Sequence, residues 1–266
     1  MTTDTALTLP DIQSTRDPRN MPIHRVGVTS VSYPITFLSG SAVESVEQST
    51  VAKFNMFVDL PADCRGTHMS RFTQSLRDWQ SPFSLASLSE FCDRMRTSLD
   101  SSEASVGVRF PWFVDRLAPV TREAGKLRLE VAIEVVTGSN TDAVLTVTGP
   151  ATSLCPCSKE ISKHGAHNQR SELEVSIRPS AGSTISIEEL FELMESSASS
   201  KVFPVLKRPD EKWVTEAAYD KPGFVEDMVR DMAVALSADE RIAWFRCSSE
   251  NFESIHQHNA YAEIER

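Results

Sequence analysis

The sequence predicts an α+β protein built from two units of the same order, each an antiparallel sheet of four strands with two helices on one face. Segments in which apolar and polar residues alternate, typical of half-buried strands, occur four times in each half of the chain. Between the second and third of them, each half carries two segments with helical apolar spacing. We therefore expect an extended arm at 1–22, a first ββααββ unit at 23–138 and a second at 139–266.

Strand predictions rest on period-two alternation. It is clearest at 126–136, where Leu127, Leu129 and Val131 fall on one side of the expected strand. Gly138 and Asn140 then provide a turn that returns the chain as a hairpin. The predicted strands cover 25–38, 51–60, 106–114, 126–136, 143–148, 171–178, 242–247 and 256–264.

Helix predictions rest on apolar spacing and on residues that cap helix starts. Ser186, followed three residues later by Glu189, has the pattern of a capping box. An earlier helix is expected to take Thr67 or Ser70 as its cap. Cys92 lies on an apolar helical stripe, so we assign it to the core. The clearest predicted helices cover 84–99 and 224–236, and one begins at 186.

Composition excludes several classes of function. Lys and Arg total 27 against 37 Asp and Glu, so the net charge of −10 disfavours nucleic acid and anionic membranes as partners. No apolar run is long enough to span a bilayer, and no signal pattern opens the sequence. Five cysteines without framework spacing indicate a reducing compartment, so we expect a cytoplasmic protein.

The stretch 153–171 concentrates metal-binding chemistry, because it contains Cys155, Cys157, His164 and His167. Thiolate and imidazole ligands suit zinc and similar divalent ions. A Cys-x-Cys pair alone is a weak signal, and buried or incidental thiols are the alternative. No second Cys-x-x-Cys or His-x-x-x-His pair exists to form a zinc finger. An open catalytic site with further ligands from other segments is the better interpretation.

Three other histidines suggest function. His256 and His258 share one face of a predicted strand, although a surface pair on an edge strand fits equally well. His68 lies at a predicted helix start near Arg71, an arrangement that suits either a bound anion or a capping loop without function.

Charged residues near these segments have a structural and a functional interpretation. Glu226, at a helix start, is most simply a partner of the helix dipole. Glu211 lies in 202–212, which two prolines are predicted to keep irregular, and is most simply a solvated charge. Three basic residues flank the cysteine and histidine stretch and suit a phosphate-bearing ligand. They are Lys159, Lys163 and Arg170.

Six motifs occur in one order along the chain. They are Gly-Thr-His-Met-Ser-Arg at 66–71, Leu-Cys-Pro-Cys-Ser-Lys-Glu-Ile-Ser at 154–162, Gly-Ala-His-Asn-Gln-Arg-Ser at 165–171, Leu-Lys-Arg-Pro-Asp-Glu at 206–211, Phe-Val-Glu-Asp-Met-Val-Arg-Asp at 224–231 and Asn-Phe-Glu-Ser-Ile-His at 251–256. Together they resemble the prokaryotic type IB GTP cyclohydrolase I, the FolE2 family. The match covers essentially the whole chain after the arm, with peripheral departures such as Cys64.

The resemblance implies a bimodular tunnelling fold and a homotetramer with active sites at subunit interfaces. It implies a metal-dependent hydrolase that converts GTP and water to 7,8-dihydroneopterin triphosphate and formate, the first step of tetrahydrofolate synthesis. The implied cofactor is a divalent manganese, zinc or iron ion. A related activity that forms a cyclic phosphate from GTP is the nearest alternative, and a binding module without turnover is another.

The resemblance also implies roles for individual residues. Glu226 corresponds to the guanine anchor. The implied metal ligands are Cys155, His167, Glu211 and His256. The implied catalytic residues are Cys155, Cys157, His256 and His258, and the further substrate contacts are His68, Arg71, Lys159 and Arg170.

Overall fold

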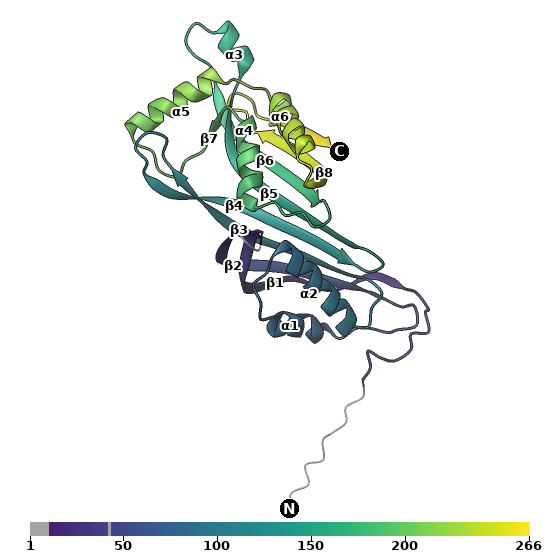
Figure 1. Cartoon of the computed structure of the whole chain (residues 1–266). Coiled ribbons are helices and arrows are strands. Elements are labelled where there is room, and N and C mark those ends of the chain that lie inside the picture. Colours follow the sequence, from purple (N-terminus) through teal and green to yellow (C-terminus); the bar gives the residue numbers. More distant parts are fainter. Residues whose placement is uncertain (1–10, 42–43) are drawn as a thin grey trace, which may run out of the picture.

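An antiparallel sheet runs through the whole protein (Figure 1). The computed structural model describes residues 11–41 and 44–266. In this part of the chain the sheet has nine strands, in the order β1-β2-β3-β4-β5-β6-β8-β9, with β7 paired to β5. The strands are β1 (Ile23–Gly40), β2 (Ser45–Leu60), β3 (Ala104–Leu117), β4 (Ala124–Thr137), β5 (Thr141–Leu154), β6 (Asn168–Pro179), β7 (Ser200–Lys201), β8 (Ile242–Asn251) and β9 (Ala260–Glu265).

The hairpin of β4 and β5 joins the two halves of the sheet. Thr137 pairs with Thr141 beside the turn, and the antiparallel register continues from there. The turn is closed by a 3.1 Å hydrogen bond from the amide of Gly138 to the carbonyl oxygen of Asn140. The two expected four-stranded sheets are therefore continuous with each other.

Helices α1, α2, α4 and α6 cover one face of the sheet (Figure 1), as predicted. Because side chains alternate between the two faces along β4, Leu129, Val131 and Ile133 are buried in the core between the sheet and these helices. Gly149 of β5 permits close packing, because a Cβ there would lie only 2.3 Å from Cε2 of Phe191 on α4. The helices are α1 (Met69–Asp78), α2 (Leu85–Ser98), α3 (Pro156–Ile161), α4 (Ile187–Ser197), α5 (Arg208–Asp220) and α6 (Val225–Ala238). No helix in the described ranges is long and apolar enough to cross a membrane.

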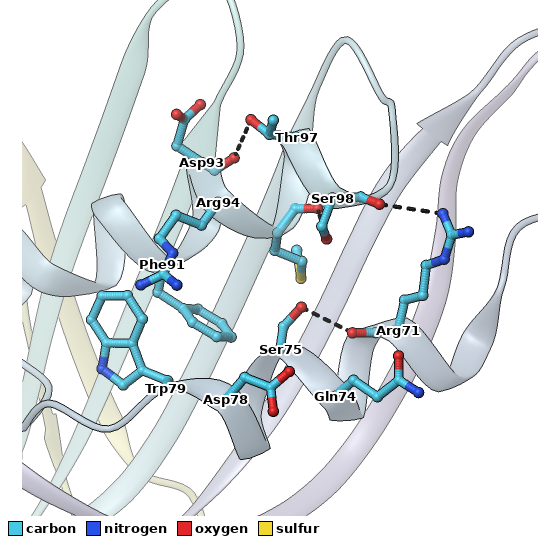
Figure 2. A pocket seen from close by; sticks show the side chains of 11 residues that line it. Arg71, Gln74, Ser75, Asp78, Trp79, Phe91, Asp93, Arg94, Thr97 and Ser98 are labelled. Atoms are coloured by element: carbon cyan, nitrogen blue, oxygen red, sulfur yellow. Dashed lines mark hydrogen bonds between the residues drawn. The ribbon is translucent and has the colours of Figure 1, made fainter.

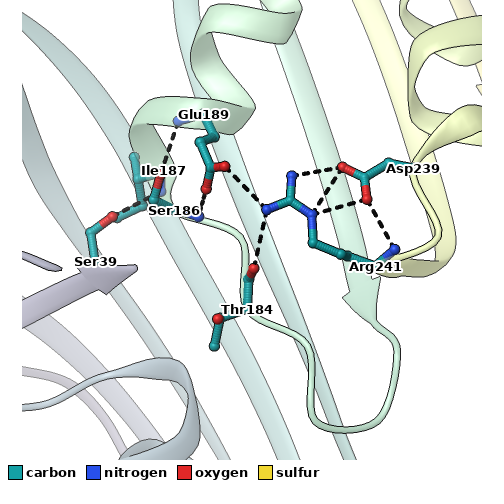
Figure 3. A network of polar contacts seen from close by, with 7 residues as sticks. All are labelled: Ser39, Thr184, Ser186, Ile187, Glu189, Asp239 and Arg241. Carbon is teal, nitrogen blue, oxygen red and sulfur yellow. Dashed lines mark hydrogen bonds and ion pairs between the residues drawn. The ribbon is translucent and has the colours of Figure 1, made fainter. Parts of the chain in front are cut away.

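A polar network holds the start of α4 against the end of β1 (Figure 3). Ser186 and Glu189 form the predicted capping box, with bonds of 3.0 and 2.9 Å. The amide of Ile187 donates to Oγ of Ser39 at 2.8 Å, and Arg241 lies 3.1 Å from the carboxylate of Glu189. These contacts tie the second half of the chain to the first.

Two predicted elements were wrong. The segment 202–212 is not irregular throughout, since α5 begins at Arg208. Pro209 lies in its first turn, where the missing N–H has no partner within the helix to lose. The strand predicted at 256–264 starts only at Ala260, because strand pairing resumes with Ala260 opposite Asn251. His256 and His258 therefore lie in a loop, and the argument that a strand aligns them fails.

Smaller differences concern caps and the N-terminal arm. Neither Thr67 nor Ser70 is the N-cap of α1; that residue is His68, and its side chain makes no capping bond. Cys92 is fully buried, as predicted. The first ten residues of the predicted arm lie outside the described residues, while Arg16 pairs with Cys64 in an isolated bridge. The short elements α3 and β7 were not predicted.

Candidate active site

The ends of β5 and β6 bring Cys155 and His167 together. Leu154 pairs with Asn168 as the last pair of the ladder. One position beyond it, the amide of Cys155 donates to the carbonyl oxygen of His167 at 3.1 Å. Cys155 is also the N-cap of α3, and its Sγ accepts from the amide of Ser158 at 3.4 Å. The hairpin thus joins the backbones of Cys155 and His167 directly.

The other two side chains of the stretch lie further out. Cys157 is exposed on α3, and His164 is exposed in the loop that follows it. Cys155 and His167, by contrast, are each half-buried. Burial therefore separates the four metal-capable side chains into an inner and an outer pair.

The imidazole of His167 is held on one side by the protein. Its Nδ1 lies 3.0 Å from Oε1 of Gln169 and 3.3 Å from Oγ of Ser254. Nε2 is therefore the nitrogen left to meet a ligand. Sequence reasoning missed Gln169 and Ser254 because neutral amides and hydroxyls carry no metal or acid-base signal. The spacing of Gln169 from His167, two residues along an extended chain, is the signal that could have found it.

His256 and His258 stack on each other in the loop between β8 and β9. Their ring centroids are 5.0 Å apart and the planes differ by 13°. Both side chains are exposed. The loop is tied to the hairpin of Cys155 and His167, since the amide of Phe252 donates to the carbonyl oxygen of Arg170 at 2.9 Å. The structure therefore keeps this histidine pair on the same end of the sheet.

Glu226 lies in the first turn of α6 and is exposed. The N-cap of this helix is Phe224, and its amide donates to the carboxylate of Asp227, the neighbour of Glu226, at 3.0 Å. Because Asp227 accepts this capping bond, the carboxylate of Glu226 is not needed for it. Close by, the amide of Gly223 donates to the carbonyl oxygen of Leu154 at 3.1 Å, which fixes the start of α6 next to Cys155.

Glu211 lies in the first turn of α5, the end of the helix that contacts the β3–β4 turn. The far end of α5 reaches α3, where Nζ of Lys159 lies 4.2 Å from the ring centroid of Tyr219. Eight residues of helix separate Glu211 from Tyr219, or about 12 Å. The adjacent Asp210 accepts bonds of 2.8 Å from the amides of the β3–β4 turn. One chain therefore does not bring Glu211 to Cys155.

His68 and Arg71 lie on α1, in the other half of the sheet from α3 (Figure 1). Nε2 of His68 is 3.3 Å from a carboxylate oxygen of Asp11. Arg71 donates to the carbonyl oxygen of Ser98 at 3.3 Å and lines a cavity of about 560 Å³ between α1 and α2 (Figure 2). Within one chain these two predicted substrate contacts do not join the predicted metal ligands.

Two predicted phosphate contacts do lie beside the hairpin. Lys159 is on α3, and its ammonium group donates to the carbonyl oxygen of Tyr219 as well as facing the ring. Arg170 follows His167 by three residues and is exposed. Positive charge at the site therefore comes from both arms of the hairpin.

The donor chemistry fits a divalent metal in part. Cys155 and His167, whose backbones are hydrogen-bonded to each other, carry a sulfur and an imidazole nitrogen, ligand types that zinc, manganese and iron accept. Among residues 11–41 and 44–266, no group of three or more His, Cys, Asp or Glu side chains is arranged to hold a metal ion. Cys155 and His167 are thus the two candidate ligands that the backbone of the described chain brings together.

Solved structures with the same fold identify the architecture. A hyperthermostable R298C mutant of Bacillus sp. TB-90 urate oxidase matches with a TM-score of 0.53 and 7% identity, over 92% of this chain and 98% of that chain. Urate oxidase from Bacillus subtilis 168 matches with a TM-score of 0.52 and 8% identity, over 92% and 99%. At these identities only the fold is shared. The protein is a tunnelling-fold protein with a cysteine and histidine site at one end of its sheet.

Sequence relatives define the family within that class. The family model described as type I GTP cyclohydrolase FolE2 matches residues 9–262. The GTP cyclohydrolase FolE2 of Magnetococcus marinus is 48% identical over 260 residues, which cover 97% of this chain and 96% of that protein. The one of Citrifermentans bemidjiense is 46% identical over 258 residues, covering 97% and 95%. The chain belongs to the FolE2 family of type I GTP cyclohydrolases, and the predictions of fold and family are confirmed.

Proposed function

We propose that this protein converts GTP and water to 7,8-dihydroneopterin triphosphate and formate, the first step of tetrahydrofolate synthesis. The observation that carries the proposal is the hydrogen-bonded pairing of Cys155 with His167 in a member of the FolE2 family. Three separate elements carry the further charged and titratable side chains that we propose act with that pair. They are the start of α6 with Glu226, the β8–β9 loop with His256 and His258, and α3 with Lys159.

Glu226 is the proposed guanine anchor. A carboxylate can accept two parallel hydrogen bonds, from N1–H and from the 2-amino group of guanine. Adenine lacks this donor pair, so the same carboxylate excludes ATP. The exposure of Glu226 supports this role, because its oxygens remain open to a ligand while Asp227 caps the helix.

Cys155, His167 and Glu211 are the proposed ligands of a divalent manganese, zinc or iron ion, with His256 either a further ligand or an acid–base group. Such an ion would supply Lewis acidity and lower the pKa of a water molecule to about 7. Cys155 offers its sulfur from the α3 N-cap, and His167 offers Nε2 because Nδ1 already has protein partners. Both residues are fixed by backbone hydrogen bonds before any ligand arrives.

His256 and His258 are the proposed proton carriers for opening of the imidazole ring of GTP and release of formate. Imidazole accepts and returns protons near neutral pH. Their stacked rings, 5.0 Å apart, place two such groups at one point of the loop. Cys157, exposed on α3, is the further residue we propose to take part there.

We propose that a homotetramer completes the active sites at its subunit interfaces. Within one chain, His68 and Arg71 lie at the start of α1 and Glu211 in the first turn of α5, away from Cys155, so a second copy is the source that would supply them. Lys159 and Arg170 would meet the triphosphate from the hairpin itself. Five free cysteines support a reducing, cytoplasmic setting for this assembly.

Turnover of GTP by metal-loaded protein tests the proposal. Oxidation of the product should give pterin fluorescence, and mass spectrometry should find an intact triphosphate together with formate. A cyclic phosphate with released pyrophosphate would assign the related activity instead. Binding of GTP without product would make the protein a binding module.

A further inference from the structure

Gln169 connects His167 to the interior beneath the site. It follows His167 by two residues at the start of β6, so the two side chains lie on the same side of the chain. Its Oε1 lies 3.0 Å from His167 Nδ1, and its Nε2 donates to Oγ of Ser153 at 2.8 Å. Gln169 is only 7% exposed, so its hydrogen-bonding groups depend on these protein partners.

The neighbours of Gln169 fix which way its amide points. Nε2 also lies 3.5 Å from a carboxylate oxygen of Glu253, and an ionised carboxylate only accepts hydrogen bonds. The reversed amide would set its carbonyl oxygen against that carboxylate. The amide nitrogen therefore faces Ser153 and Glu253, and the amide oxygen faces His167.

This orientation selects one tautomer of His167. A carbonyl oxygen can accept a hydrogen bond from Nδ1–H, whereas an unprotonated Nδ1 would direct its lone pair at the lone pairs of Gln169. Ser254, at 3.3 Å from Nδ1, is compatible with either tautomer because a hydroxyl both donates and accepts. The choice therefore comes from Gln169.

We propose that Gln169 is the positioning residue of this site. It holds His167 as the Nδ1–H tautomer, so that the lone pair of Nε2 is available to a metal ion. The proposal rests on the proposed role of His167 as a metal ligand. Partners that orient a ligating histidine in this way typically affect metal affinity by about 10- to 100-fold when they are replaced.

Manganese binding and the tautomer of His167 test the proposal in the full-length protein. Gln169→Met removes the amide at similar length. We expect the manganese Kd, measured from the electron paramagnetic resonance signal of free Mn²⁺, to rise about 10- to 100-fold. In metal-free protein labelled with ¹⁵N-histidine, we expect His167 to change from the Nδ1–H form to Nε2–H or a mixture. His167→Asn assigns the His167 signal.

A rescue variant separates positioning from packing. In the double variant Gln169→Glu/Glu253→Gln, the carboxylate at position 169 accepts from His167 Nδ1–H. The new amide at position 253 donates to that carboxylate. Tautomer and manganese affinity should return to wild-type values, and failure to return would overturn the proposal. This variant also provides the test if Gln169→Met does not fold. Gln48→Met is the matched control, because Gln48 makes amide hydrogen bonds to Phe113 in the other half of the sheet.

The remaining outcomes distinguish this proposal from the proposed function. An unchanged tautomer in folded Gln169→Met would overturn the positioning role, even with a lower melting temperature. A changed tautomer with unchanged manganese affinity would support the positioning of His167 and contradict its role as a ligand. In that case His167→Asn should also bind manganese normally.

Discussion

The amide of Gly223 donates a 3.1 Å hydrogen bond to the carbonyl oxygen of Leu154, the residue directly before Cys155. This bond ties the start of α6 to the end of β5. Glu226 therefore stands on an element that is anchored to the strand carrying Cys155, although the two are distant in sequence. This anchoring fixes the start of α6, which carries the proposed guanine anchor, relative to the end of β5, which precedes the proposed metal ligand Cys155.

Replacing Glu226 by glutamine should abolish selection of guanine, because one acceptor becomes a donor that faces a donor. Hydrogen bonds to charged groups contribute about 1.5–3 kcal/mol each, so loss of one, with a donor left facing a donor, should lower kcat/KM for GTP by at least about 10- to 100-fold. Steady-state kinetics measure this. Asp227→Asn is the control, since Asp227 caps α6 and should affect melting temperature more than GTP selection. Near-normal turnover by Glu226→Gln would refute the anchor role.

The two cysteines of α3 should respond differently to replacement. Cys155→Ala removes the sulfur at the hairpin and should lower metal affinity and activity by more than about 100-fold. This exceeds the loss of about 10- to 100-fold that follows when a residue that only orients a metal ligand is replaced. Cys157→Ala removes an exposed thiol and should keep the metal. Metal content by mass spectrometry and turnover measure both. Full occupancy in Cys155→Ala would transfer the ligand role to Cys157.

Acid should destabilise the protein partly through Asp210. Burial alone would raise the pKa of this carboxyl, but hydrogen bonds from Thr121, Lys207 and Val120 outweigh it and hold the pKa well below its ordinary value of 3.8. At acid pH, Asp210 therefore binds a proton more readily in the unfolded chain than in the folded one. The stabilisation is complete above about pH 3.8 and is lost as the pH falls toward the folded-state pKa.

Asp210→Asn should therefore lower the urea midpoint at neutral pH, and its difference from wild type should shrink below about pH 3.8. Urea unfolding at several pH values measures both. Asp115→Asn is the matched control, because the Asp115 side chain is 83% exposed in its ion pair with Lys126. A difference that does not depend on pH would show that Asp210 acts by packing alone.

The buried pair of Arg116 and Glu195 should stabilise the fold only as a pair. Their closest atoms are 2.6 Å apart, and the side chains are 12% and 1% exposed. Glu195→Met leaves a guanidinium buried without this partner and should cost about 3–5 kcal/mol. Arg116→Met/Glu195→Met removes both charges and should recover much of that loss in guanidinium chloride unfolding. A double variant no more stable than Glu195→Met would contradict this.

Much of the fold was predictable because the sheet has one buried face, which imposes alternation on strands such as β4. The helix α5 was missed because Pro209 was taken as a breaker, although a proline in the first turn removes no helical bond. His256 and His258 have strand-like spacing, but pairing with β8 ends at Asn251 and resumes only at Ala260. The spacing of residues along one segment does not reveal where it starts to pair with a neighbouring strand.

The site was predictable only where residue type reveals chemistry. Residue type pointed to Cys155, Cys157, His164 and His167 alike. The family resemblance selected Cys155 and His167, and the structure pairs these two through the backbone. Gln169 was missed, because its importance comes from buried contacts to His167 and Ser153 rather than from its own chemistry. Glu211 was assigned by motif alone, and its distance from Cys155 depends on how α5 is anchored at Asp210.

Cys155 and His167 are proposed to form the core of a metal site at which the imidazole ring of GTP is opened. The most direct measurement compares product formation from GTP by manganese-loaded wild type, Cys155→Ala and His167→Asn, using mass spectrometry for the pterin and an enzymatic assay for formate. We expect one formate per GTP and an intact triphosphate with wild type, and neither product with the two variants. Unchanged turnover in either variant, or no turnover by wild type with manganese, zinc or iron, would contradict the claim.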